Sequence, residues 1–446
     1  MSAITQELAQ FAINAQAGDV PEAVLHEGKR TVLNWIACAV AGSQTDSVAS
    51  ALAVAEELCG PRVATVLGRK ERLDISHAAF VNGVASDVLS FSDTHPATLM
   101  HPGGVVGCAI LGLAEQTRVS GKDFLHALIL GYDIGCRIGL AIYPWHYNRG
   151  WHITGTAGVF GAAAAAGRLL KLNEQQMIWA LGIAATQAAG LREMFGSMSK
   201  NLHIGRAAQN GLLSALLASK GYTSSEQSLE AKRGYLHVLG ESPNLAIITS
   251  DLGTRWEIAT NTYKPYPCGV VIHPIIEGCV TLAAQHDVDP ATVEAITLRC
   301  NPLVIELCGK KTPRDTLEAK LSVFHSAAAS VIARRMGELE YNAAFVNKPE
   351  VTALRDKVSV TVDAAIREDE TDVTLHLHGG KTLNTHIDHV IGSEHKPMSD
   401  RDMAEKFRVL VEPVLPKDRI APLIDACWNL NKLDDVSTLA RLAAID

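Results

Sequence analysis

The chain has 446 residues, of which 47% are hydrophobic and 20% are charged. This is the composition of a globular protein, and the length exceeds what one hydrophobic core supports, so we expect two domains. The net charge of −8 argues against nucleic acid as a partner. It is compatible with a small anionic substrate, because a local positive potential can exist on an acidic protein.

The N-terminal residues form neither a basic nor an apolar segment, which argues against a secretory signal. The apolar stretch 155–170 is rich in Ala and Gly, is short for a membrane span and contains Arg168, so we interpret it as a buried helix and expect no membrane contact. Nine cysteines are dispersed without a Cys-x-x-Cys pair. We therefore expect reduced thiols in a cytoplasmic protein and no zinc ribbon, although three distant cysteines could still share a cluster.

Residues 1 to about 262 show a succession of helical patterns. Apolar, Ala-rich runs that are too long for strands occur at 49–58, 105–115, 124–140, 155–170, 174–188 and 207–220. Asp46 and Asn173 are typical helix-start residues, and Gly150, Gly190 and Gly221 are typical of helix ends. Helices of such small residues pack closely, which predicts a dense bundle and allows a helical dimer interface.

The pattern changes after Pro265. Segments 293–300 and 357–363 alternate with period two, and segments 372–378 and 382–388 flank Gly379 and Gly380, a good hairpin turn. Helices are expected near 270–286 and 319–336, and Ser399 is expected to cap a helix that has Asp402 at its third position. The sequence thus predicts a mainly α protein. A large all-helical domain, discontinuous over 1–264 and 396–446, would accompany a smaller α+β domain over 265–395.

The polar segment 90–104 lies between two apolar helices. Two X-Pro steps break the helical pattern there, and Asp93, Thr94 and His101 stand close together in the sequence. The helix expected to begin near Val105 would help to hold a carboxylate at its N-terminus. The alternative is a polar loop whose Asp and Thr side chains only cap helices.

Two further segments carry cationic or titratable side chains at helix starts. His152 precedes the Ala-rich helix, where the helix dipole disfavours the imidazolium form and keeps a base available. After Ser199, a candidate N-cap, Lys200, His203 and Arg206 follow at i, i+3 and i+6, loosely along one side. An anionic ligand would explain cations at a helix start. The alternatives are a boundary residue for His152 and a solvated basic face for the others.

The expected domain junction contributes a fourth segment, and the smaller domain a fifth. Lys264 lies on a rigid, proline-fixed stretch where a cleft would lie, and Cys268 follows it as either a nucleophile or an inert core residue. His325 opens a helix, where it either faces that cleft or is packed. The motifs of serine hydrolases, P-loop NTPases, zinc proteases and dinucleotide-binding folds are absent from the sequence.

Taken together, these segments resemble the MmgE/PrpD family, which includes 2-methylcitrate dehydratases, cis-aconitate decarboxylases and iminodisuccinate epimerases. The matching pieces occur in family order and span nearly the whole chain: residues 79–83, 92–94, 101–102, 150–155, 196–208, 264–268, 319–322 and 397–407. The resemblance implies a helical domain and a smaller α+β domain with the active site between them. It also implies a homodimer and neither a metal nor another cofactor.

The resemblance also implies an active-site set, namely Asp93, Thr94, His101, His152, Lys200 and Lys264. His203, Arg206, Cys268 and His325 are further substrate-binding candidates. Two positions depart from the family pattern: Ser90 and Ser92 precede the Asp-Thr pair, where decarboxylase-like members are more acidic, and His325 replaces a tyrosine.

The chemistry common to this family is proton transfer or decarboxylation next to a carboxylate. As a hypothesis, the lysines and Arg206 clamp substrate carboxylates while His101 and His152 exchange protons. Asp93 would orient a histidine or accept a substrate hydroxyl. Three function classes compete: a metal-independent lyase acting on a di- or tricarboxylate, an epimerase or isomerase of a small dicarboxylate, and a non-catalytic carboxylate-binding protein.

Overall fold

The computed structural model describes residues 3–445 and divides into two compact units. The first unit takes in the chain up to Val88, Ser92–Thr262 and the chain from Ser399 onwards, and the second takes in Leu89–Phe91 and Tyr263–Met398. The chain is mainly helical, and its one larger sheet lies in the second unit.

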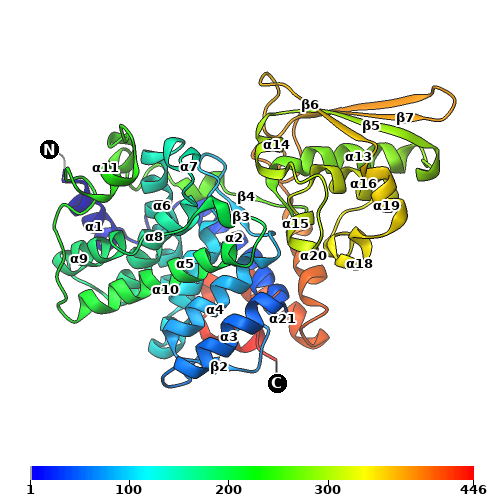
Figure 1. The fold of residues 1–446 in the computed structure, drawn as a ribbon. Coiled ribbons are helices and arrows are strands. Elements are labelled where there is room, and N and C mark those ends of the chain that lie inside the picture. The colour runs from blue at the N-terminus through cyan, green and yellow to red at the C-terminus, as the bar shows by residue number, and fades with distance from the viewer. Residues whose placement is uncertain (1–2, 446) are drawn as a thin grey trace. The chain divides into compact units, whose positions relative to one another are not determined.

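The first unit is a helical bundle (Figure 1). Its helices are α1 (Ile4–Asn14), α2 (Glu22–Gly42), α3 (Asp46–Leu58), α4 (Ile75–Val88), α5 (Pro102–Thr117), α6 (Gly121–Ile142), α7 (Trp145–Asn148), α8 (Ile153–Leu169), α9 (Glu174–Ala185), α10 (Ser199–Ser219), α11 (Tyr235–Leu239), α12 (Ala246–Thr249), α20 (Asp400–Val411), α21 (Lys417–Trp428) and α22 (Ser437–Leu442). Short 3-10 helices and strands join them: η1 (Arg192–Met194), η2 (Glu257–Thr260), η5 (Leu430–Lys432), β1 (Ala64–Thr65), β2 (Arg72–Leu73) and β3 (Asp93–Thr94). Strand β4 (Thr262–Tyr263) lies where the first unit ends.

Helix α8 is the central helix of this bundle and packs against α5, α6, α9 and α10 (Figure 1). All its residues from Ile153 to Gly167 are buried, as its Ala-rich composition predicts. Helix α6 is long and apolar enough to cross a membrane by composition alone, but 94% of its most apolar window is buried within the structure. Packing therefore accounts for the apolar surface of both helices.

Most of the expected helix starts are confirmed. Asn173 caps α9 and Ser399 caps α20, each in a reciprocal capping box with the third helical residue. Ser199 is the exception, because it is the first helical residue of α10 and Met198 occupies the cap position without a side-chain bond. The predicted cap of that helix is therefore wrong by one residue.

The second unit is an α+β structure whose sheet has the strand order β6-β5-β7-β8. Its elements are η3 (Val270–Ile272), α13 (His273–Gln285), η4 (Pro290–Thr292), β5 (Val293–Cys300), α14 (Leu303–Cys308), α15 (Thr316–Ala319), α16 (Val323–Ala333), α17 (Glu338–Tyr341), α18 (Ala343–Val346), α19 (Pro349–Arg355), β6 (Val358–Val362), β7 (Thr371–Leu377) and β8 (Thr382–Ile387). Strands β5 and β6 are parallel, with α14 to α19 in the crossover, whereas β5–β7 and β7–β8 are antiparallel. The four predicted strands and the hairpin turn are confirmed.

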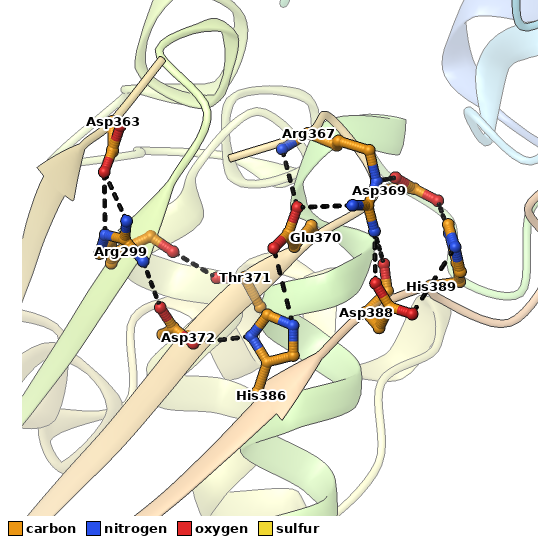
Figure 2. Close-up of polar contacts among 10 residues, drawn as sticks. All are labelled: Arg299, Asp363, Arg367, Asp369, Glu370, Thr371, Asp372, His386, Asp388 and His389. Atoms are coloured by element: carbon orange, nitrogen blue, oxygen red, sulfur yellow. Dashed lines mark hydrogen bonds and ion pairs between the residues drawn. The ribbon is translucent and has the colours of Figure 1, made fainter. Parts of the chain in front are cut away.

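The period-two alternation of these strands separates an apolar from a charged face of the sheet. Ile296, Leu298 and Val373 are buried, and α13 packs on β7 and β8. On the exposed polar face, Figure 2 shows Arg299 bonded to Asp372 across the strands, at 2.8 Å from Nη1 to Oδ2. The Asp372 carboxylate also accepts a bond from His386, and this bond is the main factor that lowers its pKa. The network extends to Arg367, Asp369, Glu370, Asp388 and His389.

The contact between α6 and α8 provides a test of this packing. A Cβ added at Gly131 of α6 would lie 2.5 Å from the carbonyl oxygen of Gly161 in α8, whereas one at Gly135, a turn later, would meet its nearest atom at 3.5 Å. Gly131→Ala should lower the melting temperature, since overpacking costs about 1–3 kcal/mol and outweighs the gain in helix propensity of about 1 kcal/mol. Gly135→Ala is the matched control and should be neutral or stabilising. Equal melting temperatures for the two variants would contradict the close approach of these helices.

Candidate active site

The segment that follows α4 holds His101 in one orientation. Its ring Nδ1 lies 2.7 Å from the carbonyl oxygen of Asp93 and 3.3 Å from Oγ1 of Thr94. Because a carbonyl can only accept, Nδ1 carries the hydrogen, and the neutral ring has its lone pair on Nε2. The backbone N–H of His101, the N-cap of α5, donates to Oγ1 of Thr154 in α8. The predicted trio therefore comes together as a positioned imidazole with its base at Nε2.

The Asp93 side chain binds the start of α5. Its Oδ2 accepts from the backbone N–H of Gly103 at 3.1 Å and from the side-chain amide of Asn261 at 3.2 Å. A Cβ on Gly103 would lie 2.8 Å from Oδ1, so only glycine permits this approach. This helix start holds a carboxylate, as expected, but the carboxylate is that of Asp93, in agreement with the alternative of a helix-capping Asp. The backbone carbonyl of Asp93, rather than its carboxylate, orients His101.

Burial governs the ionisation of Asp93. The side chain is fully buried, and this desolvation raises its pKa to about 6 despite the two hydrogen bonds to Oδ2. Oδ1 is buried and has no hydrogen-bond partner within the described chain. Near neutral pH the group therefore changes its protonation state readily and has one oxygen available to a ligand.

A buried polar network fixes the loop that carries these residues. His95 bonds Oγ1 of Thr98 at 2.8 Å and the carboxylate of Glu257 at 3.3 Å. The backbone N–H of Glu257 donates to Asp133, and Asp133 accepts from the buried guanidinium of Arg137 at 2.6 Å. The loop is thereby tied to α6, and sequence reasoning did not identify this support.

His152 and His203 form a directly bonded pair. His152 is the N-cap of α8, His203 lies in the second turn of α10, and their Nδ1 atoms are 2.8 Å apart. One Nδ1 must donate and the other must accept. In the neutral pair, one ring therefore has a lone pair on Nε2 and the other has an N–H there. The pair can hold one additional proton, whereas two additional protons would break the hydrogen bond between the Nδ1 atoms. The neutral pair thus offers a base and a proton donor side by side.

The surroundings keep both rings neutral. Burial lowers the pKa of His152 well below its ordinary value, and the positive charge of Lys200 and the neighbouring His203 and His101 lower it further. Burial, followed by Lys200, also lowers the pKa of His203. The helix dipole predicts a neutral His152, but desolvation is the main cause. The backbone N–H of His101 bonds Thr154, two residues after His152, so both histidines lie in one part of the first unit.

Lys200 forms an ion pair that the sequence did not predict. Its ammonium group lies 2.7 Å from Oδ2 of Asp87, which is buried in the last turn of α4. The other oxygen of Asp87 accepts from the hydroxyl of Ser92 at 3.1 Å. The available signal was the single carboxylate of a helix that has no other acidic residue and is mostly apolar, because such groups are rarely buried without a partner. An ammonium has three donors, so this pair leaves donors available to a ligand.

Arg206 lies apart from this group. It is exposed, and its guanidinium bonds the side chain of Gln209 at 2.6 Å. Each step of three residues turns a helix back by about 60°, so i and i+6 differ by about 120°. The expectation that Arg206 shares a side with Lys200 is therefore wrong, whereas Lys200 and His203 do act on the same neighbour, His152.

The remaining candidates lie in the second unit. Lys264 is buried, with its ammonium group 3.4 Å from the carbonyl oxygen of Cys268. The Cys268 thiol is fully buried, which raises its pKa to about 12 and makes it a core residue rather than a nucleophile. His325 is packed beside Tyr341, donates from Nε2 to the carbonyl of Glu340, and is kept neutral by burial, which lowers its pKa to about 4.

Metal-binding side chains do not gather at these positions. Across residues 3–445, no three His, Cys, Asp or Glu side chains come close enough to hold a metal ion.

Comparison with known protein families identifies the family of the chain. The MmgE/PrpD N-terminal domain matches residues 6–248, and the MmgE/PrpD C-terminal domain matches residues 266–430. The chain belongs to the MmgE/PrpD family.

Curated relatives from this family align over almost their full length. The cis-aconitate decarboxylase of Aspergillus terreus is 28% identical over 99% of this chain and 96% of its own. The human cis-aconitate decarboxylase is 27% identical over 99% of this chain and 95% of its own. A cis-aconitate decarboxylase-like protein of Aspergillus oryzae is also 27% identical, over 98% of this chain and 97% of its own. These relatives support the interpretation of this chain as an enzyme.

The buried Asp93 gives a prediction about stability in this MmgE/PrpD protein. Its folded-state pKa of about 6 exceeds the value of 3.8 for an exposed carboxyl, so the native state binds the proton more tightly. Stability is therefore lost as pH rises from 3.8 to about 6. Asp93→Asn, which does not titrate, should be more stable than the wild type at pH 7.5, by on the order of 1–3 kcal/mol. The difference should shrink at pH 5.

Thermal melts at the two pH values would check this expectation. The exposed Asp434 provides a control, since Asp434→Asn should change little at either pH. The opposite result would be that Asp93→Asn melts below the wild type, by the same margin at pH 7.5 and at pH 5. Ionised Asp93 would then stabilise the fold, and the prediction would be wrong.

Proposed function

We propose that this protein is a lyase acting on a small di- or tricarboxylate, and that the reaction is a decarboxylation of the cis-aconitate type. The observation that carries the proposal is the neutral His152–His203 pair beside the ammonium group of Lys200. The names of the full-length relatives favour decarboxylation over the other reactions of the family.

The chemistry requires a stabilised carbanion and a proton. When a carboxylate leaves as carbon dioxide, its C–C bond breaks and the electron pair stays on the neighbouring carbon, where a remaining conjugated carboxylate can delocalise it. Lys200, and in the proposal Lys264, binds carboxylate oxygens and stabilises this charge. A histidine then delivers a proton to the carbon, so one proton is taken up for each carbon dioxide released.

The hydrogen bonds of the histidines in the first unit support the proposed proton transfers. The neutral pair has both a lone pair and an N–H at its Nε2 atoms, and His101 has a further base at Nε2 because its Nδ1 donates to the Asp93 carbonyl. Asp93 is assigned to a substrate hydroxyl or acid through Oδ1, with Thr94 beside it. Dehydration is the second candidate, since a base and an acid in one site are also what the removal of water needs.

Proton NMR of the enzyme with a panel of di- and tricarboxylates distinguishes the reactions. Decarboxylation of cis-aconitate should give new alkene signals together with released carbon dioxide, whereas dehydration gives alkene signals without it. Solvent deuterium entering an unchanged skeleton would indicate an epimerase instead. If no carboxylate is turned over but one raises the melting temperature, the protein is a binding protein and the proposal is wrong.

Two substitutions test the proposed roles directly. His152→Ala and Lys200→Ala should each lower kcat/KM by about 10²-fold or more, because each removes a proton-transfer or charge-stabilising group. Exposed residues provide matched controls, namely His237→Ala and, at the end of the same helix as Lys200, Lys220→Ala. Lys200→Ala also leaves Asp87 without its ion pair, so its melting temperature must be measured as well. Wild-type turnover by folded His152→Ala would refute its assignment.

The pH dependence of kcat/KM follows from the shifted pKa values. The pKa values of His152 and His203 are both lowered from 6.5, so these bases stay neutral at pH 6.5 and are lost only at lower pH. Protonation of Asp93, with its pKa of about 6, adds to the loss. The fall of kcat/KM at acid pH should therefore be centred at about pH 6 or below. A fall centred above pH 6.5 would contradict the lowered pKa values of the buried histidines.

A further inference from the structure

The first unit has a polar cavity that the proposed chemistry does not use. It has a volume of about 670 Å³, which is within the range of small-molecule sites. It lies where α5 and α8 end and α6 begins, and its polar lining consists mainly of Arg118, Ser120, Asp123, His126, Arg168 and Lys171. None of the candidate active-site residues lines it.

Positive charge dominates this lining. Arg118, Arg168 and Lys171 face one carboxylate, Asp123, so the ionised side chains carry a net charge of about +2. Arg168 has a structural task, since its guanidinium donates to the carbonyl oxygens of Ile13 and, at 3.0 Å, Ala15, at the end of α1. Helix-end capping does not explain Lys171, which is exposed and whose ammonium group forms no hydrogen bond or ion pair within residues 3–445.

A buried histidine in the wall also needs a partner. His126 is 2% exposed, lines the cavity, and its Nε2 has no hydrogen-bond partner within the described chain. An unpaired buried nitrogen costs about 1–3 kcal/mol, so such groups are usually satisfied by a bond. Burial, together with the charge of Arg168, lowers the pKa of His126 to about 4, so the ring is neutral and can donate one N–H to an anion.

We propose that this cavity binds a small oxyanion of charge −2 or −3, with carboxylate or phosphate oxygens that contact Lys171, Arg118 and His126. Three cations match the charge of such a ligand, and the neutral imidazole adds a hydrogen bond. A monovalent anion would leave half of the net positive charge uncompensated, and an uncharged molecule would leave all of it.

The same two helices connect this cavity with the candidate active site. His101 caps the start of α5 and His152 caps the start of α8, and both helices end at the cavity after about 24–26 Å. Ligand binding at their C-terminal ends would therefore act on the elements that position two proposed proton-transfer groups. The cavity is in this way placed to be a regulatory site.

Calorimetric titration of the full chain at constant ionic strength tests the proposal, with inorganic phosphate and citrate as separate probes. Saturable binding is expected for at least one probe. Lys171→Glu and Arg118→Glu should each weaken that binding about tenfold or more, because an attraction becomes a repulsion. Lys311→Glu is the control, since Lys311 is exposed in the second unit and does not line the cavity, and it should bind like the wild type.

Two further variants distinguish binding in this cavity from binding at the active site. Without ligand, His126→Phe should keep or raise the melting temperature, because it removes an unpaired buried nitrogen. With the anion present, the same variant should show a smaller rise in melting temperature than the wild type. Lys200→Ala should leave this binding event unchanged, since Lys200 belongs to the active site. The phosphate and citrate titrations identify which anion is bound. Binding of neither probe, or equal binding by the wild type and Lys171→Glu, would overturn the proposal.

Discussion

The candidate active site depends on a guanidinium group that contacts no proposed reacting group. Arg137 is fully buried in α6, bonds Asp133 one turn earlier and donates to backbone carbonyls near residues 248–255, including that of Ser250 at 2.6 Å. A buried charge is tolerated only when its donors are satisfied, so this arrangement fixes the segment that leads to Glu257. Glu257 in turn holds His95, and the loop with Asp93 and His101 takes its position from that contact.

The second requirement is close packing between helices of small residues. Glycines at the contact of α6 and α8 bring the two backbones within van der Waals distance, as the close approach of Gly131 and Gly161 shows. Because the helices pack this tightly, the bundle fixes the position in space of the first turn of each helix. Because His101 and His152 are both N-cap residues, their relative placement is a property of the bundle rather than of a flexible loop.

Local sequence patterns predicted most of the secondary structure and a part of the site. The Ala-rich runs, the capping box at Ser399 and the period-two strands depend on neighbours in the sequence, and all of them appear in the structure. His152 was correctly expected at a helix start. The Lys200–Asp87 ion pair joins residues 113 positions apart, and the His152–His203 bond joins residues 51 apart. No local pattern encodes such contacts, and Arg206 was misplaced because residues at i and i+6 of a helix lie about 120° apart.

The electrostatics of the site bear on how it would receive an anion. Lys200 is neutralised by Asp87, both histidines of the pair are kept neutral, and Asp93 tends towards its ionised form above pH 6. The candidate active site therefore presents little net positive charge to a carboxylate before binding. A bound carboxylate would favour the charged form of a neighbouring imidazole and raise its pKa. The His152–His203 pair would then take up one proton as the anion binds, and this is the proton that the proposed reaction delivers to carbon. Burial keeps the pair neutral in the free protein, and the substrate itself would convert it into an acid.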